Sequence, residues 1–278
     1  MIALGNPQFQ LELLDPLADA DRLGSRYSHS GYIWQVRADG RDLLTMPFAP
    51  FEVFHGTGFP DEFEQPVGYE DARVGEGFVK IGVGAVEKNA DHAYTNHDRH
   101  RVLQPAEHEV RVEDGRVVFG QALSYKGYGY AYEKRIELTG EASFRIAHRL
   151  ANTGQRAWES FWYSHIFLAR PALGAPAWLA VPQTYQPTDE NPLTPSAGRY
   201  PLPAQAEICA WWQVPPGLCD AHQVGGPDRV FSARCDSPCM GFMFYQNPRV
   251  VSPEPRVAIA LQPGQDQAWS TEYALLRP

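Results

Sequence analysis

The chain has 278 residues and a formal net charge of −9, and 44% of its residues are hydrophobic. This apolar fraction excludes a disordered chain, and the acidic balance disfavours nucleic acid or an anionic membrane as a partner. The 24 glycines and 24 prolines oppose a long helical bundle, because a proline inside a helix costs about 3 kcal/mol. These properties favour a compact protein with many short strands and many turns.

Targeting signals and metal-binding cysteine pairs are not evident in the sequence. Residues 1–6 lack the basic start and apolar core of a signal peptide, and no apolar run reaches the length of a membrane span. We therefore expect a cytoplasmic protein with no membrane partner. Cys209, Cys219, Cys235 and Cys239 contain no CxxC pair, and this spacing favours reduced structural thiols over a zinc site.

The first half of the chain shows alternating patterns separated by turns. Apolar and polar residues alternate up to Ala38-Asp39-Gly40, and they alternate again on both sides of Glu113-Asp114-Gly115. An Asp-Gly pair between two alternating segments is a strong signal for a hairpin. A further strand is predicted around residues 144–150, because its apolar residues share one face. Helix evidence is confined to residues 11–23, where Pro16 interrupts the apolar spacing.

Residues 158–168 differ from the other predicted strands because both of their faces are apolar. Trp158 and Trp162 lie on one face, and Phe161 and Tyr163 lie on the other together with His165. Such a strand is expected inside a sheet, with cover above and below. Two stacked sheets would provide that cover.

The rest of the chain continues the all-β pattern. Eleven prolines between residues 171 and 227 leave two possibilities open, an irregular excursion or short strands joined by proline turns. Residues 257–261 and 269–275 alternate on either side of Pro263-Gly264, which predicts a final hairpin. We therefore predict one large antiparallel β-sandwich, formed by residues 1–278 as a single domain.

A group of histidines lies in the middle of the chain. His92, His97 and His100 stand close together among acidic residues, and His108-Glu109 follows. The pattern of two histidines separated by one residue, which a cupin metal site requires, does not occur. A solvated polar loop is therefore favoured over a metal site, and a loop that contacts a sugar is a third possibility. We expect no metal and no cofactor.

His165 and Glu254 are the two residues best suited to acid–base chemistry. A histidine inside an aromatic strand is costly unless its ring nitrogens find partners, and an imidazole can exchange protons near neutral pH. Glu254 lies between Pro253 and Pro255, which hold it on a stiff backbone. Taken alone, His165 fits a core histidine and Glu254 fits an exposed turn. Local patterns give no reason to bring the two together.

Four stretches nevertheless occur in an order that is familiar. The sequence resembles the aldose 1-epimerase (galactose mutarotase-like) superfamily, especially its less characterised bacterial branch, over most of residues 25–275. The stretches that carry the resemblance are DEF at 61–63 with PVGYE at 66–70 and GEGFVKIGVG at 75–84, RIAHRLANTG at 145–154, YSHIF at 163–167, and SPEP at 252–255 with the segments 263–264 and 269–273.

This resemblance implies a large antiparallel β-sandwich with a sugar cleft on the concave face of one sheet. It also implies a reaction without a metal, in which His165 matches the general acid and Glu254 matches the general base. Ring opening of a hemiacetal needs a base for the anomeric hydroxyl proton and an acid for the ring oxygen. A carboxylate and an imidazole on opposite sides of the sugar meet that need.

The sequence departs from well-studied mutarotases at the residues that contact the sugar. Their Gly-Arg-Asn-Arg segment and their His-Gly-Gly loop are missing, and the region from Glu62 to Lys88 stands in their place. Glu62, Lys80 and Lys88 are the candidate sugar contacts there. His97 is a candidate for the missing substrate histidine, and Trp162 and Tyr163 are candidates for stacking on the sugar ring.

Three classes of function therefore stand side by side. The first is a carbohydrate epimerase, or mutarotase, that interconverts the α and β anomers of an aldose or aldose derivative. It would act on a small-molecule sugar, without nucleic acid or membrane partners, as a monomer or homodimer. The second is a non-catalytic carbohydrate-binding protein on the same fold. The third is a metal-dependent isomerase or lyase built on His92, His97 and His100.

Overall fold

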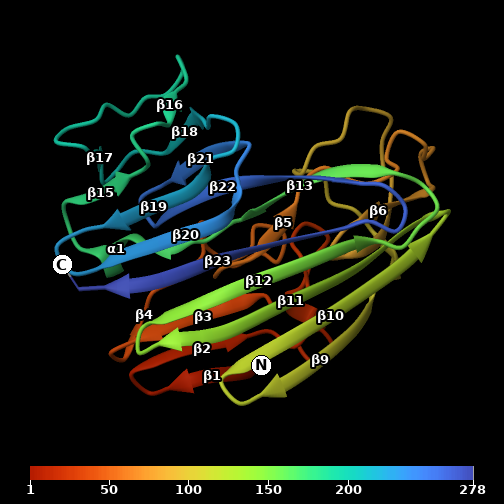
Figure 1. Cartoon of the computed structure of the whole chain (residues 1–278), viewed down its shortest axis with the longest axis horizontal. Helices are drawn as coiled ribbons and strands as arrows, with labels where there is room; N and C mark the ends of the chain where they lie inside the picture. The colour runs from red at the N-terminus through yellow and green to blue at the C-terminus, as the bar shows by residue number, and fades with distance from the viewer. Residues whose placement is uncertain (278) are drawn as a thin grey trace.

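The computed structural model describes residues 1–277, and nearly all of its regular structure is β-strand. Two large antiparallel sheets share one hydrophobic core, and two smaller sheets lie beside them (Figure 1). The predicted all-β sandwich is confirmed. The prediction that residues 1–278 form a single domain stays a prediction.

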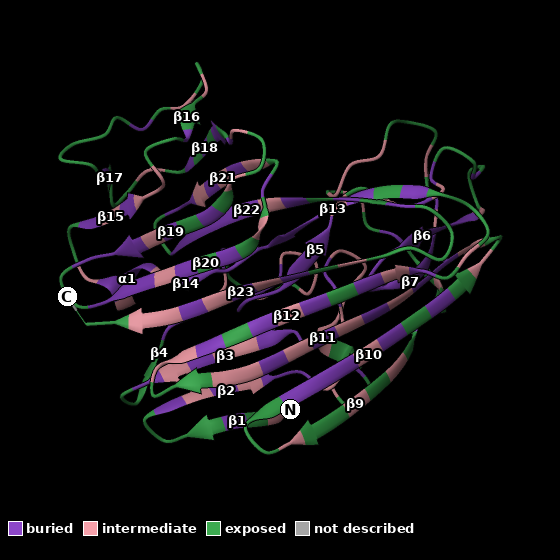
Figure 2. Cartoon of the chain, viewed as in Figure 1, coloured by how far each residue is buried: buried purple, intermediate pink, exposed green. Residues whose placement is uncertain are grey.

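The larger sheet has nine strands and contains the longest antiparallel pairs. Its order is β17 (Tyr200–Leu202), β15 (Ala177–Ala180), β19 (Cys219–Gly225), β20 (Val230–Pro238), β23 (Asp266–Leu276), β12 (Ser143–Asn152), β11 (Tyr128–Gly140), β10 (Arg116–Tyr125) and β9 (Glu107–Glu113). Buried and solvent-accessible residues alternate along β12 (Figure 2). This alternation is the period of two that a half-buried strand requires.

The second large sheet carries the segments that the resemblance singled out. Its order is β16 (Gln186–Pro187), β18 (Ile208–Gln213), β21 (Gly241–Gln246), β22 (Val250–Leu261), β13 (Trp158–Ser164) and β5 (Asp61–Phe63), and β14 (Leu168–Ala169) also pairs with β22. We call it the cleft sheet, because one of its faces bears the cavity described below. The proline-rich region therefore forms short strands in both sheets.

The remaining elements are short. One small sheet contains β1 (Ile2–Asn6), β2 (Phe9–Leu13), β3 (Ile33–Ala38) and β4 (Arg41–Asp42), and the other contains β6 (Gly77–Lys80), β7 (Gly84–Glu87) and β8 (Val102–Pro105). The helices within residues 1–277 are α1 (Arg170–Leu173) and a 3-10 turn (Ala20–Arg22). Neither is long or apolar enough to cross a bilayer.

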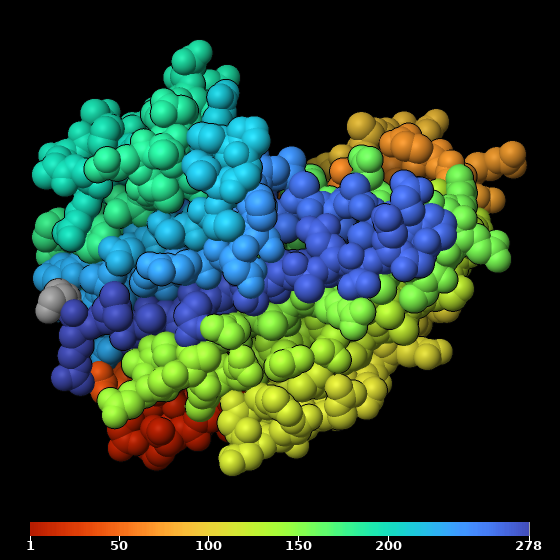
Figure 3. Space-filling view, viewed as in Figure 1, coloured from red at the N-terminus to blue at the C-terminus, as the bar shows by residue number. Residues whose placement is uncertain are grey.

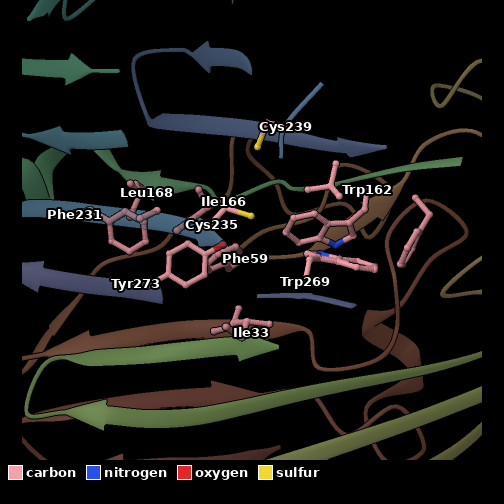
Figure 4. Close-up of a cluster of buried hydrophobic side chains, with 14 of the residues drawn as sticks. Ile33, Phe59, Trp162, Ile166, Leu168, Phe231, Cys235, Cys239, Trp269 and Tyr273 are labelled. Atoms are coloured by element: carbon pink, nitrogen blue, oxygen red, sulfur yellow. The ribbon is translucent and has the colours of Figure 1, made fainter. Parts of the chain in front are cut away.

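The core between the two large sheets is rich in aromatic side chains. Phe59 meets Tyr273 edge-on with ring centroids 5.0 Å apart, and Trp162 lies 5.5 Å from Trp269 (Figure 4). Trp162 comes from the cleft sheet and Trp269 comes from the nine-stranded sheet. Contacts of this kind bury large apolar areas and hold the sheets together. Because Trp162 belongs to this core, it is not available to a sugar.

Two of the predicted hairpins are confirmed and the last one is wrong. The Asp39-Gly40 turn joins β3 to β4, and the Asp114-Gly115 turn joins β9 to β10. The Pro263-Gly264 turn joins β22 to β23, but these strands pair with different neighbours in different sheets. Alternation and a turn look the same whether the chain returns beside itself or crosses to the facing sheet.

Residues 158–168 also differ in detail from the prediction. The strand β13 ends at Ser164, and it lies between β22 and the edge strand β5 rather than in the middle of the sheet. The face that carries Trp162 packs into the core. The face that carries Tyr163 is covered by charged side chains, including Glu62 and Arg256, instead of the other large sheet.

Candidate active site

The pairing of β13 with β22 explains why His165 meets Glu254. The last residue of β13 that pairs with β22 is Tyr163, whose partner is Arg256. Antiparallel strands run in opposite directions, so a residue two positions after Tyr163 faces a residue two positions before Arg256. These two residues are His165 and Glu254. Residues two apart share a face of the sheet, so both side chains emerge on the Tyr163 side.

Between Tyr163 and β14 the chain does not pair with β22, but its backbone still forms hydrogen bonds to residues 58–60, the segment before β5. The N–H of His165 donates to the carbonyl of Pro60 at 2.8 Å, and the N–H of Phe167 donates to the carbonyl of Gly58 at 2.8 Å. Gly58 has a φ of +71°, and a Cβ there would come within 2.4 Å of the Ile33 carbonyl oxygen. A glycine is therefore needed at this support of the histidine segment.

His165, Glu254 and Ser252 form one hydrogen-bonded group. The distance from Nδ1 of His165 to Oε1 of Glu254 is 3.1 Å, and Nδ1 lies 3.0 Å from Oγ of Ser252. Ser252 also donates to Oε1 of Glu254 at 2.9 Å. The Glu254 side chain has no exposed surface, whereas 9% of the His165 side chain is exposed. Nδ1 thus faces the carboxyl group, and Nε2 is the ring nitrogen left for a ligand.

Burial governs the protonation of this pair. It raises the pKa of Glu254 to about 8, against the opposing effect of the nearby Arg256 charge. Burial also lowers the pKa of the His165 imidazole well below its usual value. Strongly shifted groups in contact with each other are typical of catalytic sites.

His165 forms part of the wall of a cavity of about 410 Å³ on the exposed face of the cleft sheet. Aromatic side chains and two arginines also line it, namely Tyr27, Phe167, Trp211, Arg26 and Arg256. The outline of the molecule is hollowed between the teal segments near residue 200 and the orange segments near residue 70 (Figure 3). The cavity is lined by residues from both sides of this hollow, for example His97 and Trp211.

Glu62, Lys80 and Tyr163 belong to one buried network. Oε2 of Glu62 accepts the hydroxyl of Tyr163 at 2.6 Å and Nε of Arg26 at 3.0 Å. Nζ of Lys80 lies 3.3 Å from Oε1 of Glu62 and donates to the hydroxyl of Tyr94 at 2.9 Å. Glu62 and Lys80 are fully buried and do not line the cavity, so they support Arg26 and Tyr163 rather than contact a ligand.

The other two predicted sugar contacts lie apart from each other. Nζ of Lys88 donates to the backbone of Tyr69 at 3.3 Å and lies 4.2 Å from the centre of that ring, away from the cavity. His97 lines the cavity. His92 lies beside Asp98, and His100 packs on Phe78, so the three clustered histidines do not converge. Within residues 1–277, no three metal-ligating side chains come together in a way that would hold an ion.

Three cavity residues were not anticipated from the sequence. Arg26 precedes the first segment of the resemblance, and no local pattern marks it. Arg256 follows Glu254 by two residues on the same strand, so a period of two places both on one face. Trp211 lies between the buried Ala210 and Trp212 and is 37% exposed at the rim of the cavity. The alternation in β18 could have revealed it.

The contact between His165 and Glu254 differs from the arrangement that the resemblance implies. Atoms 3.1 Å apart leave no room for a sugar ring between them, and Glu254 is not part of the cavity wall. The expectation that the two groups flank a sugar is therefore wrong for this structure. The reason is geometric, because facing positions of adjacent strands are only about 5 Å apart.

Comparison with known proteins supports the fold. No protein-family model and no curated protein sequence matches the chain. Several solved structures do match over nearly their full length. A proposed aldose 1-epimerase of Escherichia coli K12 is 14% identical with a TM-score of 0.65, and the match covers 99% of this chain and 98% of that one.

Two further structures agree with it. A galactose mutarotase-like protein of Lactobacillus casei is 12% identical with a TM-score of 0.62, covering 99% of this chain and 100% of its own. The chain has the galactose mutarotase-like fold. A protein of Synechocystis sp. PCC 6803 is 13% identical with a TM-score of 0.66, covering 100% of this chain and 96% of its own. At these identities the likeness concerns the fold, and the chemistry has to be argued from the site itself.

Proposed function

We propose that the protein is a carbohydrate epimerase that interconverts the α and β anomers of an aldose or aldose derivative. The observation that carries this proposal is the His165–Glu254 pair, whose imidazole borders a cavity while its carboxyl group is buried behind it. A histidine whose Nδ1 is held by a carboxyl group presents Nε2 in a defined orientation, as in catalytic triads.

The pair is suited to moving one proton between two oxygens of the same carbon. Nε2 of His165 takes the proton of the anomeric hydroxyl and returns it to the ring oxygen as the bond between that oxygen and the anomeric carbon breaks. The ionised carboxyl group of Glu254 stabilises the imidazolium formed in between. The new carbonyl group then rotates, and the reverse transfers close the ring on its other face.

The remaining walls are suited to holding a sugar. Trp211 offers an exposed aromatic face at the rim, and the apolar face of a pyranose stacks well on such a ring. Arg26 and Arg256 bring donors that cannot lose their charge near neutral pH. Charged donors of this kind favour the oxygen on which negative charge develops during ring opening.

The test is anomer exchange measured by polarimetry and by NMR on freshly dissolved aldoses. Wild-type protein should speed the equilibration, and His165→Asn should reduce kcat by about 10²-fold or more. Glu254→Gln should reduce it by a similar factor, because the amide cannot stabilise an imidazolium. Full rates in both variants would contradict the mechanism.

A matched control exists elsewhere in the chain. His222 and Asp220 form another buried pair, with Nδ1 2.6 Å from Oδ2, and neither lines the cavity. His222→Asn should therefore retain the exchange rate per folded molecule, with folding checked by circular dichroism. Saturable sugar binding without faster exchange would instead identify a non-catalytic carbohydrate-binding protein.

A further inference from the structure

A second and larger cavity of about 660 Å³ opens on the same face of the cleft sheet. It is lined by Glu159 and Phe161 from β13 and by Ala260 from β22. Phe161 is two residues from Tyr163, so it shares the face that bears the first cavity. The two cavities therefore lie in line along one strand.

An ion pair stands at the boundary between the two cavities. Glu64 lines both of them, and its Oε2 lies 3.2 Å from a terminal nitrogen of Arg256. The Arg256 guanidinium is 4.9 Å from the ring centre of Phe161 and 4.9 Å from that of Tyr163. The ion pair and the two aromatic rings therefore fix the Arg256 guanidinium at the boundary between the two cavities.

The second cavity combines aromatic rings with carboxylates. Its aromatic lining residues are Tyr69, Tyr94, Tyr128, Trp158 and Phe161, and Glu70 and Glu159 add exposed acidic groups. Neither Glu70 nor Glu159 takes part in an ion pair within the described residues 1–277. Aromatic faces and hydrogen-bond acceptors together suit a polyhydroxylated ring, and the acidic groups disfavour an anionic one.

We propose that the second cavity binds the adjoining sugar unit of a reducing disaccharide or longer oligosaccharide whose reducing end lies at His165. The inference rests on the proposed function and names its substrate class. Phe161 and His165 are four residues apart, which is about 13 Å along an extended chain. That length exceeds one pyranose ring, so a ligand that reaches both cavities contains at least two units.

The test compares cellobiose, maltose and lactose with glucose and galactose in the anomer-exchange assay. We expect kcat/KM for at least one disaccharide to exceed that of the monosaccharides by about tenfold. Glu159→Ala and Phe161→Ala should lower kcat/KM for that disaccharide about fivefold more than for the monosaccharides. Trp211→Ala, in the first cavity, should lower both alike.

Glu159 is exposed, and its truncation leaves the core intact, so this variant remains informative if Phe161→Ala does not fold. The matched control is Glu141→Ala, which removes another exposed glutamate that lines neither cavity. Equal losses for both sugar classes in Glu159→Ala, or a preference for monosaccharides, would overturn the inference.

The inference and the proposed function fail in different ways. If no sugar exchanges faster, the proposed function fails, and calorimetry with cellobiose and glucose then tests the second cavity alone. Tighter binding of cellobiose that Glu159→Ala selectively weakens would sustain the second cavity as a sugar site. Equal affinity for cellobiose and glucose, or an effect of Glu159→Ala on both, would reject it.

Discussion

The hydroxyl of Tyr163 donates a hydrogen bond of 2.6 Å to Glu62, although 101 residues separate the two in the chain. Burial by itself raises the pKa of Glu62, but the charges of Arg26 and Lys80 and this hydrogen bond bring that pKa down to about 2. Glu62 therefore stays ionised inside the protein. It holds Tyr163 and Arg26 in place at the cavity wall.

Tyr163→Phe removes that hydrogen bond and leaves the ring in place. Because the acceptor is charged and buried, we expect the free energy of unfolding to fall by about 1.5–3 kcal/mol. Urea denaturation at pH 7 measures it. Tyr245→Phe is the matched control. Its hydroxyl donates to the exposed Glu207 at 3.0 Å and accepts from Nδ2 of Asn247, which also donates to the Pro47 carbonyl, so its loss should cost less than about 1 kcal/mol. Equal costs for the two variants would contradict this account.

The anomer-exchange rate should depend on the ionisation of Glu254. Burial raises its pKa to about 8, and the proposed mechanism needs the carboxylate to stabilise the imidazolium of His165. We therefore expect kcat to rise with pH, with a midpoint near pH 8. Glu254→Gln should lose this rise as well as most of the rate. A wild-type profile that is flat between pH 6 and pH 9 would argue against the role of Glu254.

The contribution of Glu254 to stability should change in the opposite direction, at pH values below its raised pKa. The folded protein keeps a proton on Glu254 up to about pH 8, whereas the unfolded chain releases it near the ordinary value of 4.5. At Glu254 the folded state thus holds one more proton between these values, so the contribution of this group to the free energy of unfolding falls by about 1.4 kcal/mol per pH unit there. The lowered pKa of His165 acts in the opposite sense below its ordinary value of 6.5, so the difference between wild type and Glu254→Gln is the quantity to compare. Denaturation of wild type and Glu254→Gln at pH 5 and pH 8 measures the difference, and parallel curves would contradict it.

Asp61 and Lys134 form a fully buried ion pair, with Nζ 2.6 Å from Oδ2. Burial raises the pKa of Asp61 and lowers the pKa of Lys134, opposed in each case by the partner. Lys134→Met leaves the buried Asp61 carboxyl group without its cation and should cost about 3–5 kcal/mol. The double variant Asp61→Leu with Lys134→Met should recover most of that loss in thermal denaturation. A harmless single substitution would show that the pair is not coupled.

Local patterns predicted the elements better than their partners. The Asp-Gly turns identified two hairpins, because such a turn joins strands that pair beside it. Pro263-Gly264 gave the same pattern where the chain crosses between sheets. Which sheet a strand joins depends on packing with distant segments, and alternation contains no information about that.

The candidate site shows the same limit. His165 and Glu254 could be paired only through the resemblance, whereas the structure supplies the physical reason in the Tyr163–Arg256 pairing. Glu62 and Lys80 were expected to touch the ligand, but they are buried behind the cavity wall. Arg26 occupies the place at the wall instead. A sequence shows that charges are near each other along the chain, but burial decides which of them reaches solvent.

His165 can meet Glu254 only because it lies an even number of positions along the chain from Tyr163, which places both side chains on the same face of the sheet. An imidazole placed at an odd count from Tyr163 would emerge beside Trp162, in the core between the sheets. One residue inserted or deleted between Tyr163 and His165 would therefore separate the pair entirely, however little it changed the composition. Two residues inserted there would keep the histidine on the same side of the sheet, because side chains alternate with a period of two.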